Sequence, residues 1–334
     1  MFDIITIGTA TRDVFLKSRL FKVLHDPKHL KKLGFTTGEA ECLALGSKIE
    51  VDDMAVTVGG GAANTAVTFT RYGLETAALI RVGNDSAGDD IAETLKREKV
   101  KLYAIRDKNN PTAYSTILLS HNGERTILVY RGASESLEER EVPFSKLKAK
   151  WAYIAPGGIS FPVMEKIIAT LKKNNTFIAF NPSKHYIALP KAKLHKILHE
   201  VDIVLVNCEE ASRITGVHYE NTRGIFKKLD DIVPGIAVMT DGKKGAFVSD
   251  GSEIFESPAF DNKKFVDSTG AGDAFGAAFV IGIMKTKSIE EAIRMGMANS
   301  ASVVEHIGAQ EGILHKREYN DKRWKGLKIK VSKL

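Results

Sequence analysis

The sequence predicts an α/β protein with a mostly parallel central sheet and a small β-sheet lid. Short apolar runs alternate with helix-length amphipathic segments, the pattern of a parallel sheet covered by helices on both faces. Two β-rich stretches, 113–120 and 125–131, interrupt this alternation. The Asn-Gly pair between them is a strong hairpin signal, so we expect them to form a separate sheet. Glycine-rich turns precede two of the expected helices.

Length and composition fit a large globular domain. The chain has 334 residues, of which 43% are hydrophobic and 27% are charged. No run of about 18 uncharged apolar residues is present, and the N-terminus has no basic segment typical of a signal peptide, so we expect neither a membrane span nor secretion. Only Cys42 and Cys208 occur, which argues against a disulfide framework or a cysteine-based zinc site and favours a cytoplasmic location.

The expected elements follow one another in a regular order. Periodicity predicts strands and helices at the positions given next. The strands are 3–8, 76–82, 151–155, 176–181, 203–207, 235–240 and 246–249; the helices are 62–72, 87–98, 162–173, 209–215, 273–284, 289–297 and 298–306.

The predicted lid comes from two segments that interrupt the predicted core. We expect an α/β core from residues 1–8, 58–101 and 135–315, and a lid from residues 9–57 and 102–134. Segments near Val14 and 49–57 are expected to pair with the hairpin, and such a lid would exclude water during a reaction. An ordinary surface hairpin is the alternative. The basic stretch at about 17–48 lacks clean periodicity, so its fold is not predicted.

The net charge of +7 is concentrated in two stretches, the one near 17–32 and a basic C-terminal tail at 316–334. Basic clusters arise on solvated surfaces and also in contacts with anionic substrates or nucleic acid. The sequence shows no zinc finger, RNA-recognition motif or helix-turn-helix pattern. A solvated surface is therefore favoured, and a nucleic-acid partner is not expected.

The most informative segment is Phe265-Val-Asp-Ser-Thr-Gly-Ala-Gly-Asp-Ala-Phe275. Gly270, Ala271 and Gly272 leave backbone N–H groups unshielded at the start of an apolar helix, where amides and the helix dipole form an anion site. A carboxylate at Asp273 suits phosphoryl transfer, because the amides hold charge on the phosphoryl group while the carboxylate takes the proton of the attacking hydroxyl. The alternative reading is an aspartate that merely stabilises a helix N-terminus.

A second glycine-rich turn lies at Val58-Gly-Gly-Gly-Ala-Ala-Asn-Thr-Ala66. Its glycines predict close backbone approach, and Asn64 offers a donor and an acceptor to a hydroxyl group. Neither the dinucleotide-binding Gly-x-Gly-x-x-Gly spacing nor the Gly-x-x-x-x-Gly-Lys phosphate loop is present. Tight packing alone explains such a turn equally well.

The string Asp-Ser-Thr-Gly-Ala-Gly-Asp-Ala-Phe resembles the C-terminal signature of the ribokinase (PfkB) family of sugar and nucleoside kinases, and the likeness extends over about residues 1–315. The resemblance implies a three-layer ribokinase-like fold and ATP-dependent phosphorylation of a small sugar or sugar-like substrate. It implies that Asp273 is the general base, and an ordinary aspartate pKa of about 4 would keep it ionised. Asp13, with Gly59, Gly60 and Asn64, then binds substrate hydroxyls.

The resemblance also implies a nucleotide site. Asn207 and Glu210 would act near magnesium and phosphate, Glu210 through water, while Thr240 and Gly242 would contact phosphate or ribose and Asn299 would border adenine. Many family members bind potassium, chiefly through carbonyl groups. Here that candidate cation site comprises Asp267 and Thr269 with His306 and Gly308, and His306 departs from the expected residue.

Some features leave the substrate open. The strand 152–158 has no acid where ribokinases present a glutamate to the sugar, which weakens a strict ribose assignment. Arg131 resembles an arginine of relatives that accept polar or anionic substrates, and a lid-surface charge is the equal alternative. A nucleoside kinase and a non-catalytic sugar- or nucleic-acid-binding relative are the competing functions. The lid could also pair two subunits in a homodimer.

Overall fold

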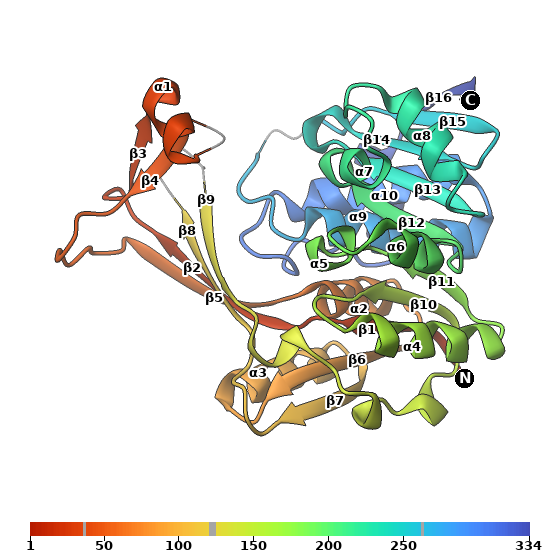
Figure 1. The fold of residues 1–334 in the computed structure, drawn as a ribbon, viewed down its shortest axis with the longest axis horizontal. Helices are drawn as coiled ribbons and strands as arrows, with labels where there is room; N and C mark the ends of the chain where they lie inside the picture. Colours follow the sequence, from red (N-terminus) through yellow and green to blue (C-terminus); the bar gives the residue numbers. More distant parts are fainter. Residues whose placement is uncertain (36–37, 120–124, 262–263) are drawn as a thin grey trace.

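The computed structural model describes residues 1–35, 38–119, 125–261 and 264–334. Its main feature is a ten-stranded sheet in the order β16-β15-β14-β13-β12-β11-β10-β1-β6-β7 (Figure 1). The pairs from β13 to β7 are parallel, and those from β13 to β16 are antiparallel. These strands are β1 Phe2–Gly8, β6 Thr76–Gly83, β7 Lys101–Asp107, β10 Ala149–Ala155, β11 Phe177–Phe180, β12 Ile203–Asn207, β13 Ile236–Thr240, β14 Ala246–Ser249, β15 Glu253–Ser257 and β16 Lys330–Lys333.

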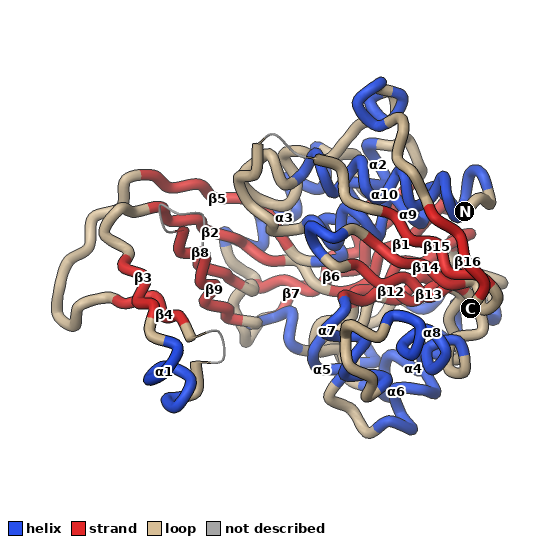
Figure 2. The backbone as a smooth tube through the Cα atoms, turned by 90° about the horizontal axis from the view of Figure 1, so that it is seen from above, coloured by secondary structure: helices blue, strands red, loops and turns tan. Residues whose placement is uncertain are grey.

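Helices cover both faces of this sheet (Figure 2). One face carries α4 Phe161–Lys173, α5 Lys184–Ile187, α6 Lys191–Leu198, α7 Cys208–Thr215 and α8 Thr222–Asp230. The other carries α2 Gly61–Arg71, α3 Ser86–Arg97, α9 Ala271–Thr286 and α10 Ile289–Val303. Alternate residues of β1 point to opposite faces, as strand geometry requires, so Ile5 and Ile7 pack with the first layer and Ile4 with the second.

The lid is a separate four-stranded sheet in the order β5-β2-β8-β9. Its strands are β2 Thr11–Lys17, β5 Asp53–Gly59, β8 Tyr114–Leu119 and β9 Arg125–Tyr130. β2 pairs antiparallel with β5 and parallel with β8, and β8 pairs antiparallel with β9. Only two residues separate β1 from β2, so the lid leaves the core directly at the carboxyl end of a central strand.

The basic insertion forms a small subdomain beyond the lid (Figure 1). A two-stranded antiparallel sheet joins β3 Lys22–His25 to β4 Glu39–Cys42. Between them lie helix α1 Pro27–Leu30 and the 3₁₀ turn Lys31–Leu33. Asp26 caps α1 and its carboxylate also contacts His29 Nδ1 at 2.7 Å.

The α/β architecture predicted from the sequence is confirmed, and three details differ. β7 belongs to the large sheet because it pairs with β6, whereas the predicted lid segment began at residue 102. The helices predicted at 289–297 and 298–306 form one helix, α10, which contains no proline and continues through Gly296 to Val303. The predicted hairpin turn at 121–124 lies outside the described residues.

The C-terminal tail is also folded onto the core. β16 extends the large sheet beyond β15, a strand that the sequence pattern did not reveal. Trp324 is buried against Phe260, and Arg323 pairs with Glu305, so part of the tail's charge is neutralised within the molecule. Over the described ranges, no helix is long and apolar enough to cross a membrane.

Candidate active site

The candidate site lies at the carboxyl ends of the parallel strands, where ligands bind in open α/β sheets. β1 ends at Gly8 with a φ of +143°, and a Cβ on this residue would lie 1.8 Å from the carbonyl oxygen of Ala155. The turn before α2 packs equally closely, since Gly61 N donates to Thr9 Oγ1 at 3.0 Å and a Cβ on Gly61 would meet Ala155 at 2.6 Å. Glycine is therefore required at both positions, at the end of β1 and at the start of α2.

The N-terminus of α9 has the geometry of an anion site. Gly270 caps the helix in the left-handed conformation, with a φ of +76°. The first hydrogen bond of the helix runs from Ala274 N to Gly270 O at 2.8 Å, so the N–H groups of residues 271–273 precede the intrahelical ladder. Ala271 N lies 3.3 Å from Ser268 O, which closes the turn. A Cβ on Gly272 would meet no atom within 4 Å, so this side of the helix end faces open space.

Asn64 holds the Asp273 carboxylate at the mouth of this turn. Its Nδ2 donates to Asp273 Oδ2 at 2.8 Å, which brings α2 and α9 together over 209 residues of sequence. The second oxygen, Oδ1, lies 3.5 Å from where a Gly61 Cβ would stand. The exposure of Asp273 as a whole residue is intermediate.

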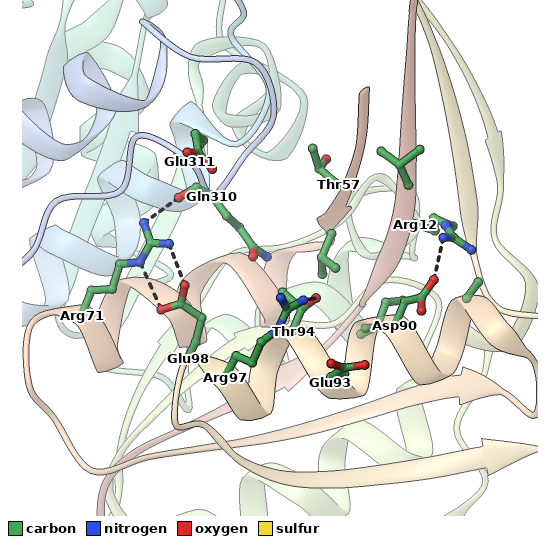
Figure 3. A pocket seen from close by; sticks show the side chains of 14 residues that line it. Arg12, Thr57, Arg71, Asp90, Glu93, Thr94, Arg97, Glu98, Gln310 and Glu311 are labelled. Carbon is green, nitrogen blue, oxygen red and sulfur yellow. Dashed lines mark hydrogen bonds and ion pairs between the residues drawn. The ribbon is translucent and has the colours of Figure 1, made fainter. Parts of the chain in front are cut away.

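Gln310 completes this arrangement and was missed by sequence reasoning. Its Nε2 donates to Asn64 Oδ1 at 3.0 Å. Arg71 fixes the loop that carries it, because Nη1 donates to the carbonyl of Gln310 at 2.8 Å while Nη2 pairs with Glu98 Oε1 at 2.7 Å (Figure 3). These residues line one side of a charged cavity of about 530 Å³ between α3 and β5. The hydrogen bonds thus orient the Asn64 amide toward Asp273.

Asp13 lies in the lid strand β2 and is 5% exposed. Thr11 Oγ1 donates to Asp13 Oδ1 at 2.8 Å, and Ser115 on β8 also contacts the carboxylate through its hydroxyl. A Cβ on Gly59 would lie 1.9 Å from Asp13 Oδ2. Gly59 therefore leaves the space that this carboxylate occupies, which is the physical reason for glycine there.

Burial raises the pKa values of both carboxyl groups. Desolvation raises the pKa of Asp273 above the usual aspartate value, the hydrogen bond from Asn64 lowers it, and the negative charge of Asp13 raises it. Desolvation likewise raises the pKa of Asp13, with a smaller contribution from the charge of Asp267. The two carboxylates sense each other, so they belong to one electrostatic site.

Comparison with known proteins assigns the family. The model of the pfkB family of carbohydrate kinases matches residues 29–317. The chain belongs to the pfkB family. This membership confirms the predicted class of enzyme, a phosphotransferase that acts on an alcohol group. The Gly270–Asp273 turn and the Asn64 turn are two of the motifs through which the sequence resembled this family.

Individual pfkB relatives are distant. The chain is 26% identical to an ATP-dependent 6-phosphofructokinase of Thermoanaerobacterium thermosaccharolyticum, over 79% of this chain and 84% of the relative. It is 27% identical to a nucleoside kinase of Methanothermobacter thermautotrophicus, over 76% and 81%. The structure of Arabidopsis thaliana ribokinase complexed with ribose and ATP has a TM-score of 0.77 and 23% identity, over 97% and 99%, and this likeness confirms the ribokinase-like fold.

We call residues 267–273, the turn that leads into α9, the anion turn. Beside it lies an open hollow of about 700 Å³. Its walls come from the segment after β13, the loop between β15 and α9, and helix α10. The lining side chains include Phe260, Phe265, Met297, Ala301 and Val304, with Ser268 and Ser300 as polar groups. Lys243 also lines the hollow, and its Nζ lies over the Phe265 ring, 5.2 Å from the ring centre. Gly242 lines this hollow, whereas Thr240, the last residue of β13, is not among the lining residues.

Asn207 and Glu210 form a capping box at the start of α7. Glu210 N donates to Asn207 Oδ1 and Asn207 N donates to Glu210 Oε2, each at 2.9 Å. Burial raises the pKa of Glu210, while the bond from Asn207 N lowers it. Across the described part of the chain, no group of three or more His, Cys, Asp or Glu side chains is arranged to hold a metal.

The structure gives three further residues from the predicted sites partners within the protein. Asn299 is fully buried, donates to Ala274 O and accepts from Leu314 N, so it joins α10 to α9 while its neighbours on the helix line the hollow. Arg131 forms an exposed ion pair with Glu135 at 3.5 Å. His306 is exposed and its Nδ1 lies 3.0 Å from Ser302 O.

Asp267 is enclosed by donors. Its Oδ1 accepts from Arg125 Nη1 at 2.9 Å, from Thr269 N at 3.0 Å and from Thr269 Oγ1 at 2.8 Å. Its Oδ2 accepts from Gly308 N at 3.2 Å. Asp267, Thr269 and Gly308 therefore lie together, as predicted for the cation site. The positive charge beside Asp267 is that of Arg125 from the lid. No signal in the sequence identified Arg125.

The hydrogen bond from Asn64 predicts a measurable pH effect. This bond lowers the pKa of Asp273, so Asn64→Ala should raise that pKa further and should require a higher pH to keep the carboxylate ionised. We expect the acid limb of the kcat–pH profile to move to higher pH in this variant, with activity retained above the limb and lost below it. If the acid limb stays in place or moves to lower pH, the group that titrates in the kcat–pH profile is not Asp273.

Proposed function

We propose that this protein transfers the γ-phosphoryl group of ATP to a hydroxyl of a small sugar or sugar-like molecule, with Asp273 as the general base. One observation carries the proposal. Asn64 Nδ2 holds the Asp273 carboxylate at 2.8 Å, at the N-terminus of α9, where the backbone N–H groups make no intrahelical hydrogen bonds. A hydroxyl at this carboxylate would lose its proton as the phosphoryl group arrives on the amides. Family membership and the relatives' kinase activities support this assignment.

The acceptor site in this proposal lies between the lid and the turn before α2. Asp13 and Asn64 bind and orient hydroxyl groups, and Gly59 and Gly60 permit close approach of the acceptor to the backbone. Such orientation lowers the activation barrier, because the acceptor loses its translational and rotational entropy on binding and not in the reaction step. Arg131 lies at the end of β9 and would enter this site only after leaving Glu135.

The nucleotide occupies the 700 Å³ hollow in this proposal, with its base against Phe260, Val304 and their apolar neighbours and its phosphates toward Gly270. Mg²⁺ accompanies the nucleotide and neutralises phosphate charge. Glu210 fits a contact through water, since one carboxylate oxygen is bonded to Asn207 N and Mg²⁺ keeps several of its waters. A cytoplasmic location belongs to the same proposal, because both cysteines are free and ATP is the donor.

An acceptor screen tests the proposed function. The purified protein is incubated with ATP and Mg²⁺ and with pentoses, hexoses, sugar acids, sugar phosphates and nucleosides, and ADP formation is followed. We expect ADP formation that depends on one class of acceptor. ATP binding without any acceptor-dependent turnover would instead favour a non-catalytic relative.

Nucleoside kinase is the second candidate function. Phe15 lies two residues after Asp13 on the same side of the lid, and it packs with Ile117, Leu119, Ala55 and Ile307. This apolar group would cover the base of a nucleoside whose ribose lies at Asp13. The screen decides between the two, because a nucleoside kinase phosphorylates nucleosides in preference to free sugars.

The nucleotide hollow makes a separate prediction. Ser300 is partly exposed on α10 and lines the hollow, so Ser300→Tyr would fill space that adenine needs. We expect the KM for ATP to rise about tenfold or more, which corresponds to about 1.4 kcal/mol of binding, with little change in the KM for the acceptor. Ser252→Tyr in the exposed turn after β14 is the control. Equal effects of both variants on ATP would place the nucleotide elsewhere.

A homodimer through the lid is also proposed. The edge strand β9 exposes Ile127, Leu128, Val129 and Tyr130, with exposed fractions of 41–58%. An exposed apolar edge strand is a ready pairing surface. We expect light scattering to give twice the mass of one chain, and Leu128→Lys to give a monomer. A monomeric wild-type protein at tens of micromolar would contradict this part of the proposal.

A further inference from the structure

Arg125 of the lid contacts the anion turn. Arg125 begins β9, and in Figure 1 the loop between β15 and α9 reaches toward that strand. The Arg125 guanidinium donates through Nη1 to Asp267 Oδ1 at 2.9 Å and also to the hydroxyl of Ser268. Both acceptors belong to the turn that leads into Gly270, and Ser268 also lines the nucleotide hollow.

The Asp267 carboxylate already has a positively charged partner. Its side chain is completely buried, while the Arg125 side chain is 30% exposed. Three donors occupy Oδ1 and the amide of Gly308 occupies Oδ2. A buried carboxylate needs a compensating positive charge, and here a guanidinium supplies it together with directed hydrogen bonds. Arg125 therefore compensates the charge of Asp267 in the place where a monovalent cation was predicted from the sequence.

The same lid face holds the second segment that meets Asp267. Ile307 packs against the lid residues Phe15, Ile117 and Leu119. The next residue is Gly308, whose amide binds Asp267, and a Cβ on Gly308 would lie 3.0 Å from Thr57 of β5. The lid thus touches both segments that enclose the carboxylate, one by an ion pair and one by apolar packing.

Resting on the proposed function, we propose that Arg125 is a built-in cation that replaces a monovalent metal ion at Asp267 and couples the lid to the anion turn. The guanidinium carries the same single positive charge as such an ion. Because it is attached to the lid, its charge reaches Asp267 only when the lid lies against the core. Arg125 is a positioning residue, which acts through Asp267 and Ser268 on the turn that binds the phosphoryl group.

The proposal has two consequences for turnover. The wild-type enzyme should change by less than about twofold when potassium replaces tetramethylammonium at constant ionic strength. Arg125→Ala should lower kcat about tenfold or more with a smaller change in the KM for ATP, and low millimolar guanidinium or potassium should restore much of the loss. Arg125→Lys should retain more activity than Arg125→Ala. The matched control is Arg140→Ala, which removes an exposed arginine paired with Glu138.

A second arm of the experiment needs no turnover. Hydrogen exchange is measured on peptides that contain the amides of Thr269 and Gly308, both of which donate to Asp267. We expect faster exchange in Arg125→Ala than in Arg140→Ala, and slower exchange again when guanidinium is added. If no acceptor is phosphorylated in the screen, this arm still tests Arg125. Where Arg125→Ala does not fold, Arg125→Gln keeps a polar side chain with hydrogen-bond donors and removes the charge.

Three results would overturn the proposal. The first is a wild-type enzyme that requires potassium. The second is an Arg125→Ala variant that matches Arg140→Ala in both turnover and hydrogen exchange. The third is a folded Arg125→Ala variant whose loss no added cation restores, which would make the arginine a structural contact and not a replacement for an ion.

Discussion

Asp273→Asn should lower kcat by about 10²- to 10⁴-fold, the usual contribution of a general base. The carboxamide has nearly the same shape as the carboxylate and can still accept the hydrogen bond from Asn64 Nδ2. It cannot take a proton from the acceptor hydroxyl at neutral pH. Steady-state kinetics give kcat, and calorimetry with ADP gives nucleotide affinity, which we expect to remain close to that of the wild type.

The affinity measurement separates loss of chemistry from loss of fold. Asp90→Asn serves as a matched control, because Asp90 pairs with Arg12 at 2.6 Å in the charged cavity beside α3 (Figure 3), whose lining includes no residue of the Gly270–Asp273 turn. It should keep kcat within about twofold of the wild type, as surface ion pairs contribute little. Wild-type turnover in Asp273→Asn would show that another group accepts the proton.

Asp13→Ala should reduce kcat/KM for the acceptor about a hundredfold or more. A hydrogen bond to a charged group contributes about 1.5–3 kcal/mol, and a carboxylate of this kind binds one or two hydroxyls. The variant also leaves Thr11 Oγ1 without its acceptor at 2.8 Å. Initial rates across acceptor concentrations should show the loss mainly as a higher KM for the acceptor, with the KM for ATP nearly unchanged.

Asp13→Asn refines this prediction, because it keeps the volume that Gly59 accommodates and removes only the charge. We expect an intermediate loss. An equal rise in the KM for ATP and for the acceptor would indicate instead that the lid itself is displaced, since Asp13 lies at the centre of β2.

Much of the fold could be predicted because its strands are buried and its turns are marked by glycine. β1, β6, β10 and β12 were expected within one or two residues of their observed bounds, since apolar runs of this length between turn residues are typical of parallel strands. β15 and β16 were missed. They are short antiparallel strands at one edge of the sheet, and β16 is wholly exposed, so it has no apolar pattern to detect.

The site was predictable where local chemistry demands particular residues. The glycines around Asp273 and before Asn64 serve close backbone approach, which a sequence can reveal. Gln310 and Arg125 were missed because neither lies in a motif and both have distant partners. Gln310 binds Asn64, 246 residues away, and Arg125 binds Asp267, 142 residues away. Asn299 shows the converse limit, because its position beside the hollow was anticipated while its burial against Ala274 depends on the packing of α9 and α10.

One structure would test the central claim most directly, a crystal structure with ADP, Mg²⁺, aluminium fluoride and an acceptor from the screen. The account predicts the fluoroaluminate on the amides that begin α9, the acceptor hydroxyl within hydrogen-bond distance of Asp273, and the adenine in the hollow beside Val304. A fluoroaluminate bound away from Gly270–Gly272, or an acceptor whose hydroxyl is out of reach of Asp273, would contradict it.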